Sequence, residues 1–493
     1  MSNNKSFTAT IGIECHVQLK TATKLFAPVD NDAREAQPNQ HISHICMGMP
    51  GALPVLNDNA LRQACRAAFV LGTKPQKYSA FDRKNYFYPD LPKGYQITQQ
   101  YYPIIKDGLV PIQVDGELRE IRIERAHIEE DAGKSIHPQV GDYSLVDLNR
   151  AGTPLLEIVS APVLRSAQEA RIYAYELYLR MRYAGISDAN LYHGNMRFDV
   201  NVSVSDTDEL GTRTETKNLN SFRSVERAVA YEIQRQTELL QKGEPIVQET
   251  RGWDEAKQRT TSQRSKEEAH DYRYFPEPDI PPIELDDAYI EDLMHTIPML
   301  PDEIRSRLIK RGISQEHVEI VIEAELDHEP ITYITLLLDD SVSAQDVKAL
   351  ANLMVNVEIP ARRDEAREDP ALVPSVDRLH IYQAVLELIQ SGSLSSTNAK
   401  LLLEQLLFTA KTPKDIADFA KNQGYIQVSD ESAIETFVDQ VIAEQSSAAD
   451  DVRRGEHKAI GFLVGCVMKQ SRGAANPAKV KALLIRKLTD SES

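Results

Sequence analysis

The chain has 493 residues, of which 42% are apolar, 26% charged and 6% aromatic, and its formal net charge is −18 at pH 7. This length exceeds what one hydrophobic core supports, so we expect several globular domains, and the acidity argues against indiscriminate nucleic-acid binding because phosphate contacts require local lysine and arginine. No apolar run approaches the roughly 18 residues of a membrane span and no signal peptide precedes the first strand, so we expect a cytoplasmic protein that contacts no membrane.

The first predicted element is a strand over residues 7–20, where apolar and polar or small residues alternate without interruption. Glu14 and His16 share its polar face, roughly 7 Å apart along the strand, whereas Cys15 is predicted to be buried behind them. A carboxylate beside an imidazole can bind a divalent metal. The alternative is that this face is simply solvated.

Residues 21–55 form a long predicted loop rich in proline. His41, His44 and Cys46 lie close together in it, but three candidate ligands without a fourth indicate zinc only weakly. The four cysteines of the chain form no Cys-x-x-Cys pair, so neither a disulfide framework nor a zinc knuckle is indicated. An amphipathic helix is predicted at about residues 57–71.

Residues 81–100 are the most unusual stretch. Aromatic residues alternate there with Arg83, Lys84 and Lys93, and two prolines interrupt the pattern. This composition does not fit an ordinary helix or strand. We therefore expect an irregular segment, which is either a functional loop or a rigid, aromatic-packed connector.

Further strands are predicted at 117–130, 143–158, 196–204 and 209–219, and helices at 167–183 and 221–240. Alternating strands separated by helices indicate an α+β domain on a mainly antiparallel sheet. A proline-rich connector at 273–282 precedes a region of almost entirely helical periodicity. We predict a cradle domain over 1–292, an all-α domain over 293–408 and a small helical tail domain over 409–493.

The polar faces of the predicted strands carry charged and polar residues that could meet in one cavity, namely Glu14, His16, Glu129, Glu130, Arg197, Asp199, Asn201, Arg213, Glu215 and Lys217. Carboxylates with one imidazole suit Mg²⁺ or Mn²⁺, and neighbouring cations suit phosphate oxygens, so the pattern predicts phosphoryl transfer. Strict alternation puts Glu129 and Glu130 on opposite faces of their strand. Taken alone, each residue is more typical of a surface charge or a structural ion pair, and only the four strands together favour a metal and phosphate site. The sequence contains no Walker P-loop, no G-x-G-x-x-G and no protein-kinase motif set.

Long segments resemble those of the GatB family, the B-subunits of aspartyl/glutamyl-tRNA amidotransferases, and they occur in order along nearly the whole chain. They are IGIECHVQL (11–19), MPGALPVLN (49–57), FDRKNYFYPDLPKGYQITQ (81–99), HIEEDAGKS (127–135), DLNRAGTPLLEIVS (147–160), RTETKNLNSF (213–222), RSKEEAHDYRYFPEPDIPP (264–282) and KAIGFLVGCVMKQSRGAANP (458–477).

The resemblance implies a cradle related in fold to glutamine synthetase and guanido kinases. It also implies that ATP and Mg²⁺ are used to phosphorylate the side-chain carboxylate of misacylated Glu-tRNA(Gln) or Asp-tRNA(Asn), after which ammonia displaces the phosphate. The alternatives are a non-catalytic tRNA-binding scaffold and a stand-alone metal-dependent ligase.

The family's site residues carry over to matching positions of this chain. Glu14, His16 and Glu130 are expected to bind the metal, with Glu129 beside them. We expect catalytic roles for Lys84, Glu129 and Asp199, and contacts of Lys84, Arg213 and Lys217 with the nucleotide.

The chain departs from the family where many members carry two Cys-x-x-Cys pairs, since residues 25–30 read LFAPVD and residues 41–48 read HISHICMG. Zinc is therefore not expected. No activated glutaminase nucleophile is visible in the sequence, and the resemblance implies a heterotrimer with a separate amidase A-subunit, which is the glutaminase, and a small C-subunit. The last 41 residues hold nine lysines and arginines against three acidic residues, a balance of +6 that suits tRNA contact.

Overall fold

The computed structural model describes residues 6–138, 140–265, 271–327, 332–368, 378–408, 413, 415–426, 431–454, 456, 458–471 and 475–489. These residues form two compact units, Met1–Asp302 and Glu303–Ser493. Each unit is described by itself.

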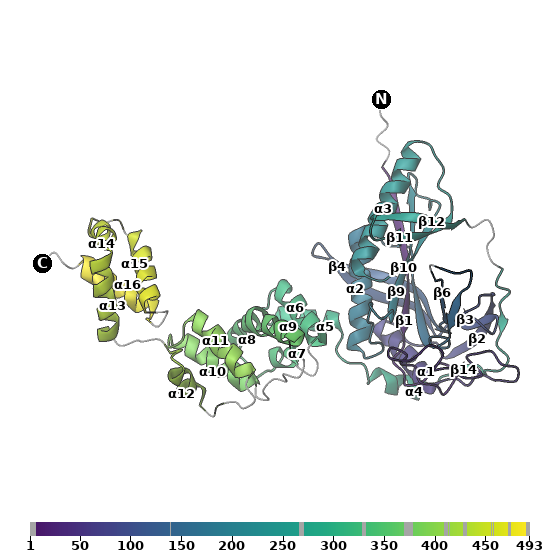
Figure 1. The fold of residues 1–493 in the computed structure, drawn as a ribbon, viewed down its shortest axis with the longest axis horizontal. Coiled ribbons are helices and arrows are strands. Elements are labelled where there is room, and N and C mark those ends of the chain that lie inside the picture. Colours follow the sequence, from purple (N-terminus) through teal and green to yellow (C-terminus); the bar gives the residue numbers. More distant parts are fainter. Residues whose placement is uncertain are drawn as a thin grey trace. The chain divides into compact units, whose positions relative to one another are not determined.

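The first unit is built on a large sheet with the strand order β12-β11-β10-β9-β1-β8-β5-β4 (Figure 1). All neighbouring strands run antiparallel except β10 and β11. The bounds are β1 Thr8–Gln18, β4 Ile105–Val114, β5 Glu117–Glu130, β8 Pro154–Ser160, β9 Met196–Ser205, β10 Thr214–Leu219, β11 Glu249–Asp254 and β12 Arg259–Ser265. The prediction of a mainly antiparallel sheet is thus confirmed.

One face of this sheet is apolar and is covered by helices. The odd-numbered residues of β1 from Ile11 to Val17, including Cys15, are almost completely buried in the core of the unit. The covering helices are α1 (Asp58–Val70), α2 (Ala167–Tyr183) and α3 (Phe222–Gln241). The side chains of Asn57, Ser166 and Ser221 accept backbone N–H groups at their N-termini, which explains where the helices begin. The opposite face keeps its polar side chains.

A smaller sheet is formed by β2 (Tyr78–Asn85), β3 (Tyr95–Tyr102), β13 (Phe275–Pro276) and β14 (Ile283–Glu284). The expectation of an irregular segment at 81–100 is therefore wrong for its two ends, which pair as an antiparallel hairpin around residues 86–94. The proline-rich connector at 273–282 pairs with β2 through β13, and β14, which follows the connector directly, also pairs with β2. The Arg83 guanidinium donates to the Glu277 carboxylate at 2.7 Å and lies over the Tyr95 ring, so cationic and aromatic residues stabilise these strands together.

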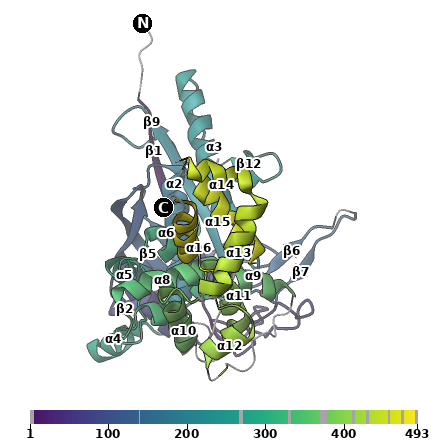
Figure 2. The same cartoon turned by 90° about the vertical axis from the view of Figure 1, so that its left-hand side faces the viewer.

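The large strand predicted over 143–158 is also divided. Its first part is β7 (Leu145–Asp147), which pairs with β6 (Lys134–Ile136) in a narrow ribbon that extends away from the large sheet (Figure 2). Its second part is β8, in the centre of the sheet. Gly152 has φ +84° between them, a left-handed conformation that permits the change of direction.

The second unit is helical. Its helices are α5 (Pro301–Lys310, beginning at the boundary), α6 (Gln315–Asp327), α7 (Tyr333–Leu337), α8 (Ala344–Leu353), a π-helix (Met354–Glu358), α9 (Ile359–Glu368), α10 (Arg378–Gln390), α11 (Ser396–Leu407), α12 (Ile416–Asn422), α13 (Glu431–Glu444), α14 (Ser446–Arg453), α15 (Ala459–Gln470) and α16 (Pro477–Thr489), and the short α4 (Asp287–Met294) precedes them in the first unit. The helices α13–α16 share a hydrophobic core.

The division at residue 302 lies near the predicted end of the cradle. The predicted start of the tail domain at residue 409 lies outside the described residues. In the parts of the chain that the structure describes, no helix is both long enough and apolar enough to cross a membrane.

Candidate metal and phosphate site

The site lies on the polar face of the large sheet, where four central strands place charged side chains side by side. In the antiparallel register, His16 on β1 is opposite Arg197 on β9 and Glu157 on β8, and Glu157 is opposite His127 on β5. Directly opposite residues point to the same face. One row across the sheet therefore consists of Arg197, His16, Glu157 and His127.

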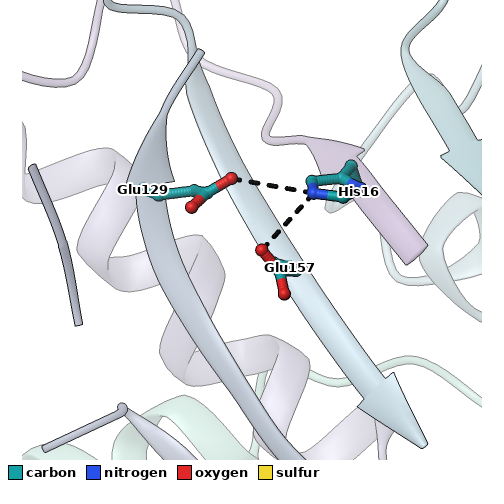
Figure 3. A group of neighbouring side chains, drawn as sticks. All are labelled: His16, Glu129 and Glu157. Atoms are coloured by element: carbon teal, nitrogen blue, oxygen red, sulfur yellow. Dashed lines mark ion pairs between the residues drawn. The ribbon is translucent and has the colours of Figure 1, made fainter. Parts of the chain in front are cut away.

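Three side chains converge in the middle of the face: His16, Glu129 and Glu157, the last two from neighbouring strands (Figure 3). His16 Nε2 lies 3.4 Å from Glu157 Oε2 and 3.8 Å from Glu129 Oε1. Their potential ligand atoms all lie within 4.8 Å of one another, and in the described part of the chain no other group of histidine, cysteine and acidic residues meets this criterion. Two carboxylates and one imidazole form a donor set that suits Mg²⁺ or Mn²⁺.

A second imidazole lies on the other side of the carboxylates. His127 Nε2 is 3.6 Å from Glu129 Oε2 and 3.5 Å from Glu157 Oε2. Its side chain is only 8% exposed, and its Nδ1 atom is buried without a hydrogen-bond partner. His127 therefore helps to orient both carboxylates.

The charges of this group support one another. Burial disfavours the charged form of His16, but its hydrogen bond to Glu157 and the charges of Glu157 and Glu129 outweigh burial and raise its pKa to about 9. Burial likewise opposes ionisation of Glu157 and Glu129, yet the nearby imidazoles and Lys84 keep both pKa values below the ordinary value for glutamate. Both carboxylates are therefore ionised at neutral pH, as metal ligands must be, whereas His16 would have to release its proton when a metal binds, because a ligating imidazole is neutral.

Lys84 completes the site from the smaller sheet. Its ammonium lies 5.0 Å from the centroid of the Tyr272 ring and 5.9 Å from that of Tyr86. Burial lowers the pKa of Lys84, but the charges of Glu129 and Glu157 outweigh this effect and raise it. Lys84 lines a cavity of about 220 Å³ with His16, Glu129, Glu157, Asp131, Arg197, Asp199 and Lys217, among other residues. The predicted catalytic residues Lys84, Glu129 and Asp199 thus share one cavity.

Glu130, one of the predicted metal ligands, lies elsewhere. Its carboxylate pairs with the Lys93 ammonium and accepts the Ile97 backbone N–H at 2.9 Å. The reason is the strand alternation, because Glu129 points to the polar face and Glu130 follows the apolar side of β5 toward β3. The structure therefore brings Glu129, and not Glu130, to His16.

Glu14, the third predicted metal ligand, lies one step further along the polar face of β1, opposite Asp199. Its carboxylate accepts a hydrogen bond from Asn201 at 2.8 Å. Burial, with a smaller contribution from the charge of Glu157, raises its pKa. Glu14 lines a second cavity of about 530 Å³ together with Arg213.

The other predicted nucleotide-binding residue, Lys217, is paired with Asp199 at 3.5 Å and with Glu215 at 3.1 Å. Asp199 Oδ1 also accepts the Asn218 backbone N–H at 2.7 Å. The pair of Lys217 and Asp199 stands between the two cavities, since Asp199 faces Glu14 across the register and lines the cavity of His16.

Two residues of the site, Glu157 and His127, were not among the residues predicted from the sequence. Glu157 is the single charged residue of β8, whose other residues up to Val159 are apolar. A charged residue in a buried strand is rarely tolerated without a partner, and this is the signal that could have found it. His127 lies two residues before Glu129 and hence on the same face of β5.

The match to known families extends over most of the chain. A family model described as the GatB/GatE catalytic domain matches residues 9–291, and a second, described as a GatB domain, matches residues 336–488. The chain belongs to the GatB family. The expected resemblance to the B-subunits of aspartyl/glutamyl-tRNA amidotransferases is therefore confirmed.

Curated relatives of the GatB family match over nearly their entire length. A protein of Carboxydothermus hydrogenoformans, named as the B-subunit of aspartyl/glutamyl-tRNA(Asn/Gln) amidotransferase, is 43% identical over 98% of this chain and 99% of its own length. Proteins of the same name from Persephonella marina and Geobacter sulfurreducens are each 44% identical, over 97% and 98% of this chain and 98% and 99% of their own lengths. The matched residues 9–291 include every residue of the candidate site.

Proposed function

We propose that this chain is the subunit of a tRNA-dependent amidotransferase that activates the amino acid esterified to a misacylated tRNA. With ATP and Mg²⁺ it phosphorylates the side-chain carboxylate of Glu-tRNA(Gln), Asp-tRNA(Asn) or both. Ammonia then attacks the carbonyl carbon of the acyl phosphate, inorganic phosphate leaves, and the amide of Gln-tRNA(Gln) or Asn-tRNA(Asn) is formed. The observation that carries this proposal is the convergence of His16, Glu129 and Glu157 beside the Lys84 ammonium.

The donor atoms fit a hard divalent cation. Glu129 and Glu157 offer ionised carboxylates and His16 offers an imidazole nitrogen, so these three residues would hold Mg²⁺, which neutralises phosphate oxygens when bound. In this proposal Glu129 and Glu157 bind the metal in place of Glu130. Glu14, which lines the adjoining cavity, remains a candidate metal ligand. Zinc is not proposed, because Cys46 in the 21–55 loop has the Lys24 ammonium 3.6 Å from its sulfur.

The chain's own residues supply the remaining chemistry. Lys84 holds a fixed positive charge at the cavity, where it can stabilise the charge of the phosphoryl group in transfer. Lys217 and Arg213, toward the neighbouring cavity, can bind the other phosphates of ATP. Asp199 fixes the position of Lys217 through their ion pair.

The proposed reaction requires partners. The sequence has no recognisable glutaminase nucleophile, so ammonia must come from an amidase A-subunit, and a small C-subunit completes a heterotrimer. This complex would act in the cytoplasm, where tRNA is aminoacylated. The cradle is proposed to share the glutamine synthetase and guanido kinase fold, and the basic tail from residue 409 to contact tRNA.

The test uses the assembled complex with both misacylated tRNAs. Glutamine hydrolysis, tRNA-dependent ATP cleavage and formation of amidated tRNA are measured for the wild-type complex and for Lys84→Ala. We expect the variant to lose ATP cleavage and amidation while retaining glutaminase activity. Normal amidation by Lys84→Ala would instead indicate a non-catalytic, tRNA-binding scaffold, and turnover by the isolated chain would indicate a stand-alone ligase.

A further inference from the structure

The polar face of the large sheet is hollowed at three successive places along β1. The first cavity, of about 530 Å³, is lined by Gly12 and Glu14. The middle cavity contains His16, Glu129 and Glu157, the proposed metal-binding group, and the third, of about 440 Å³, begins at Gln18 and Lys20. Glu14 and Gln18 are each two residues from His16, and a strand rises about 3.3 Å per residue, so the first and third cavities each begin about 7 Å from His16 along the strand.

This order suits a phosphoryl transfer between two bound substrates. The attacking and leaving oxygens of such a reaction lie roughly in line through the phosphorus atom, so donor and acceptor approach from opposite sides. The first and third cavities flank the metal-binding group in this way. One of them is therefore suited to the nucleotide and the other to the carboxylate that receives the phosphoryl group.

The linings of the two cavities differ in chemistry. Among the described residues that line the first cavity, Arg213 is the one cation, beside the carboxylates of Glu14 and Glu124. The lining also includes Val159, Pro162 and Leu210, whose apolar side chains suit the flat face of a nucleobase. The third cavity is lined largely by polar and charged side chains, with the cations Lys20, Arg34, Arg150 and Arg197 against the carboxylates Asp32, Asp131 and Asp188. Lys20 is paired with Asp188 and Arg34 with Asp32, so Arg150 and Arg197 share the remaining carboxylate, Asp131. The third cavity suits an anionic, strongly hydrated ligand.

Arg197 joins the third cavity to the site. Together with Asp131 it lines both the third and the middle cavity, and it is directly opposite His16 in the register. The Asp131 carboxylate is shared by two guanidinium groups, at 3.0 Å from Arg197 and 3.4 Å from Arg150. One carboxylate cannot neutralise two arginines, so a net positive charge remains at this junction.

The two arginines are engaged to different extents. Arg150 also donates to the backbone carbonyls of Ala132 at 3.0 Å and Gly133 at 2.6 Å, which anchor its side chain. Arg197 makes its hydrogen bond to Asp131 through one nitrogen, Nη2, and its side chain is 23% exposed. Its remaining N–H groups can therefore bind a ligand, and the fork of a guanidinium matches a carboxylate.

We propose that the third cavity holds the aminoacyl end of the acceptor tRNA, and that Arg197 binds the side-chain carboxylate and directs it toward the middle cavity. This inference rests on the proposed function and assigns the first cavity to the nucleotide. The dimensions agree, because the three C–C bonds from the α-carbon of a glutamyl group to its carboxylate extend about 4 Å. The ester would then lie in the third cavity while the carboxylate reaches the row of His16.

The inference is tested in the assembled complex by comparing Arg197→Ala, Arg197→Lys and Arg213→Ala. Arg197→Ala is expected to lower kcat/KM for misacylated tRNA at least 100-fold and to leave the Kd for ATP within threefold of wild type. Arg197→Lys restores charge without the fork and should recover only part of the loss. Arg213→Ala should show the reverse pattern, with a raised Kd for ATP and an unchanged KM for tRNA.

A matched control is Arg171→Ala, which removes an exposed arginine of α2 that pairs with Glu226 on α3 at 3.4 Å and lines none of the three cavities, and which should leave all constants unchanged. An increase in the Kd for ATP with Arg197→Ala would overturn the assignment of the two cavities. Wild-type kcat/KM for tRNA in this variant would show that Arg197 does not bind the acceptor. Both results require a wild-type complex that cleaves ATP in response to tRNA, whereas absence of that activity would contradict the proposed function itself.

Discussion

The two adjacent glutamates of β5 offer a sharp test, because the sequence pattern left open which of them binds metal. Glu129 Oε1 lies 3.8 Å from His16 Nε2 on the polar face, whereas the Glu130 carboxylate pairs with Lys93 on the other side of the strand. We therefore expect Glu129→Gln to lose metal binding and Glu130→Gln to keep it. Gln preserves the shape of either side chain, so the two variants differ in position alone.

The magnitudes follow from the contacts. Mutation of a residue that hydrogen-bonds to a metal ligand typically lowers metal affinity 10–100-fold. Loss of Glu129, which would bind the metal directly, should therefore lower metal affinity about 100-fold or more, which is about 3 kcal/mol. The Lys93 and Glu130 side chains are only 10% and 6% exposed. Breaking a buried ion pair costs about 3 kcal/mol of folding stability. Glu130→Gln should therefore lower the melting temperature without weakening metal binding.

The assay is titration of the metal-free protein with Mn²⁺, followed by calorimetry and by the paramagnetic signal of the free ion. Thermal unfolding is measured on the same samples. If Glu130→Gln abolishes Mn²⁺ binding and Glu129→Gln does not, the assignment from strand alternation is refuted. Equal loss in both variants would mean that the site depends on the β5 terminus as a whole.

Three further results are expected. In metal-free protein the NMR titration of His16 should have its midpoint near pH 9, and Glu157→Gln should lower that midpoint. Because the pKa is raised in the folded protein, the contribution of protonated His16 to folding stability is complete below about pH 6.5 and is lost as the pH rises through 9. A wild-type midpoint at or below 6.5 would contradict the described contacts. In the helical unit the buried Glu358 carboxylate accepts hydrogen bonds from Arg362, Arg378 and Tyr382. Glu358→Leu should therefore destabilise that unit by about 3 kcal/mol, because two buried arginines lose their partner. An unchanged thermal unfolding transition would contradict this prediction. A chain ending at residue 426, without α13–α16, should raise the KM for tRNA in the complex at least tenfold and retain glutaminase activity. An unchanged KM would exclude α13–α16 from tRNA contact.

Local periodicity was sufficient to predict the main elements. The alternation of β1 predicted which of its residues are buried, and Cys15 lies in the core as expected. The helix predicted over 167–183 is α2, with Ser166 as its N-cap. These features depend on neighbouring residues in the chain, so their signal is contained in short windows of sequence.

The aromatic stretch at 81–100 shows where local signals fail. Its two ends form a hairpin because they pair with each other and with β13, which lies almost 200 residues later. Arg83 and Lys84 lie in β2, where partners from the 272–277 segment support them. The strand propensity of a segment depends on its cross-strand neighbours, and these were not evident from the segment itself.

By itself the sequence determined the family, the antiparallel sheet and its polar face. The tertiary structure alone decided which carboxylates meet His16, because the register between strands sets these contacts and local periodicity does not contain it. It selected Glu129 over Glu130 and brought in Glu157 from a strand whose sequence is mostly apolar. It also placed Arg197 opposite His16, between the cavity of the metal-binding group and the cavity proposed for the aminoacyl end.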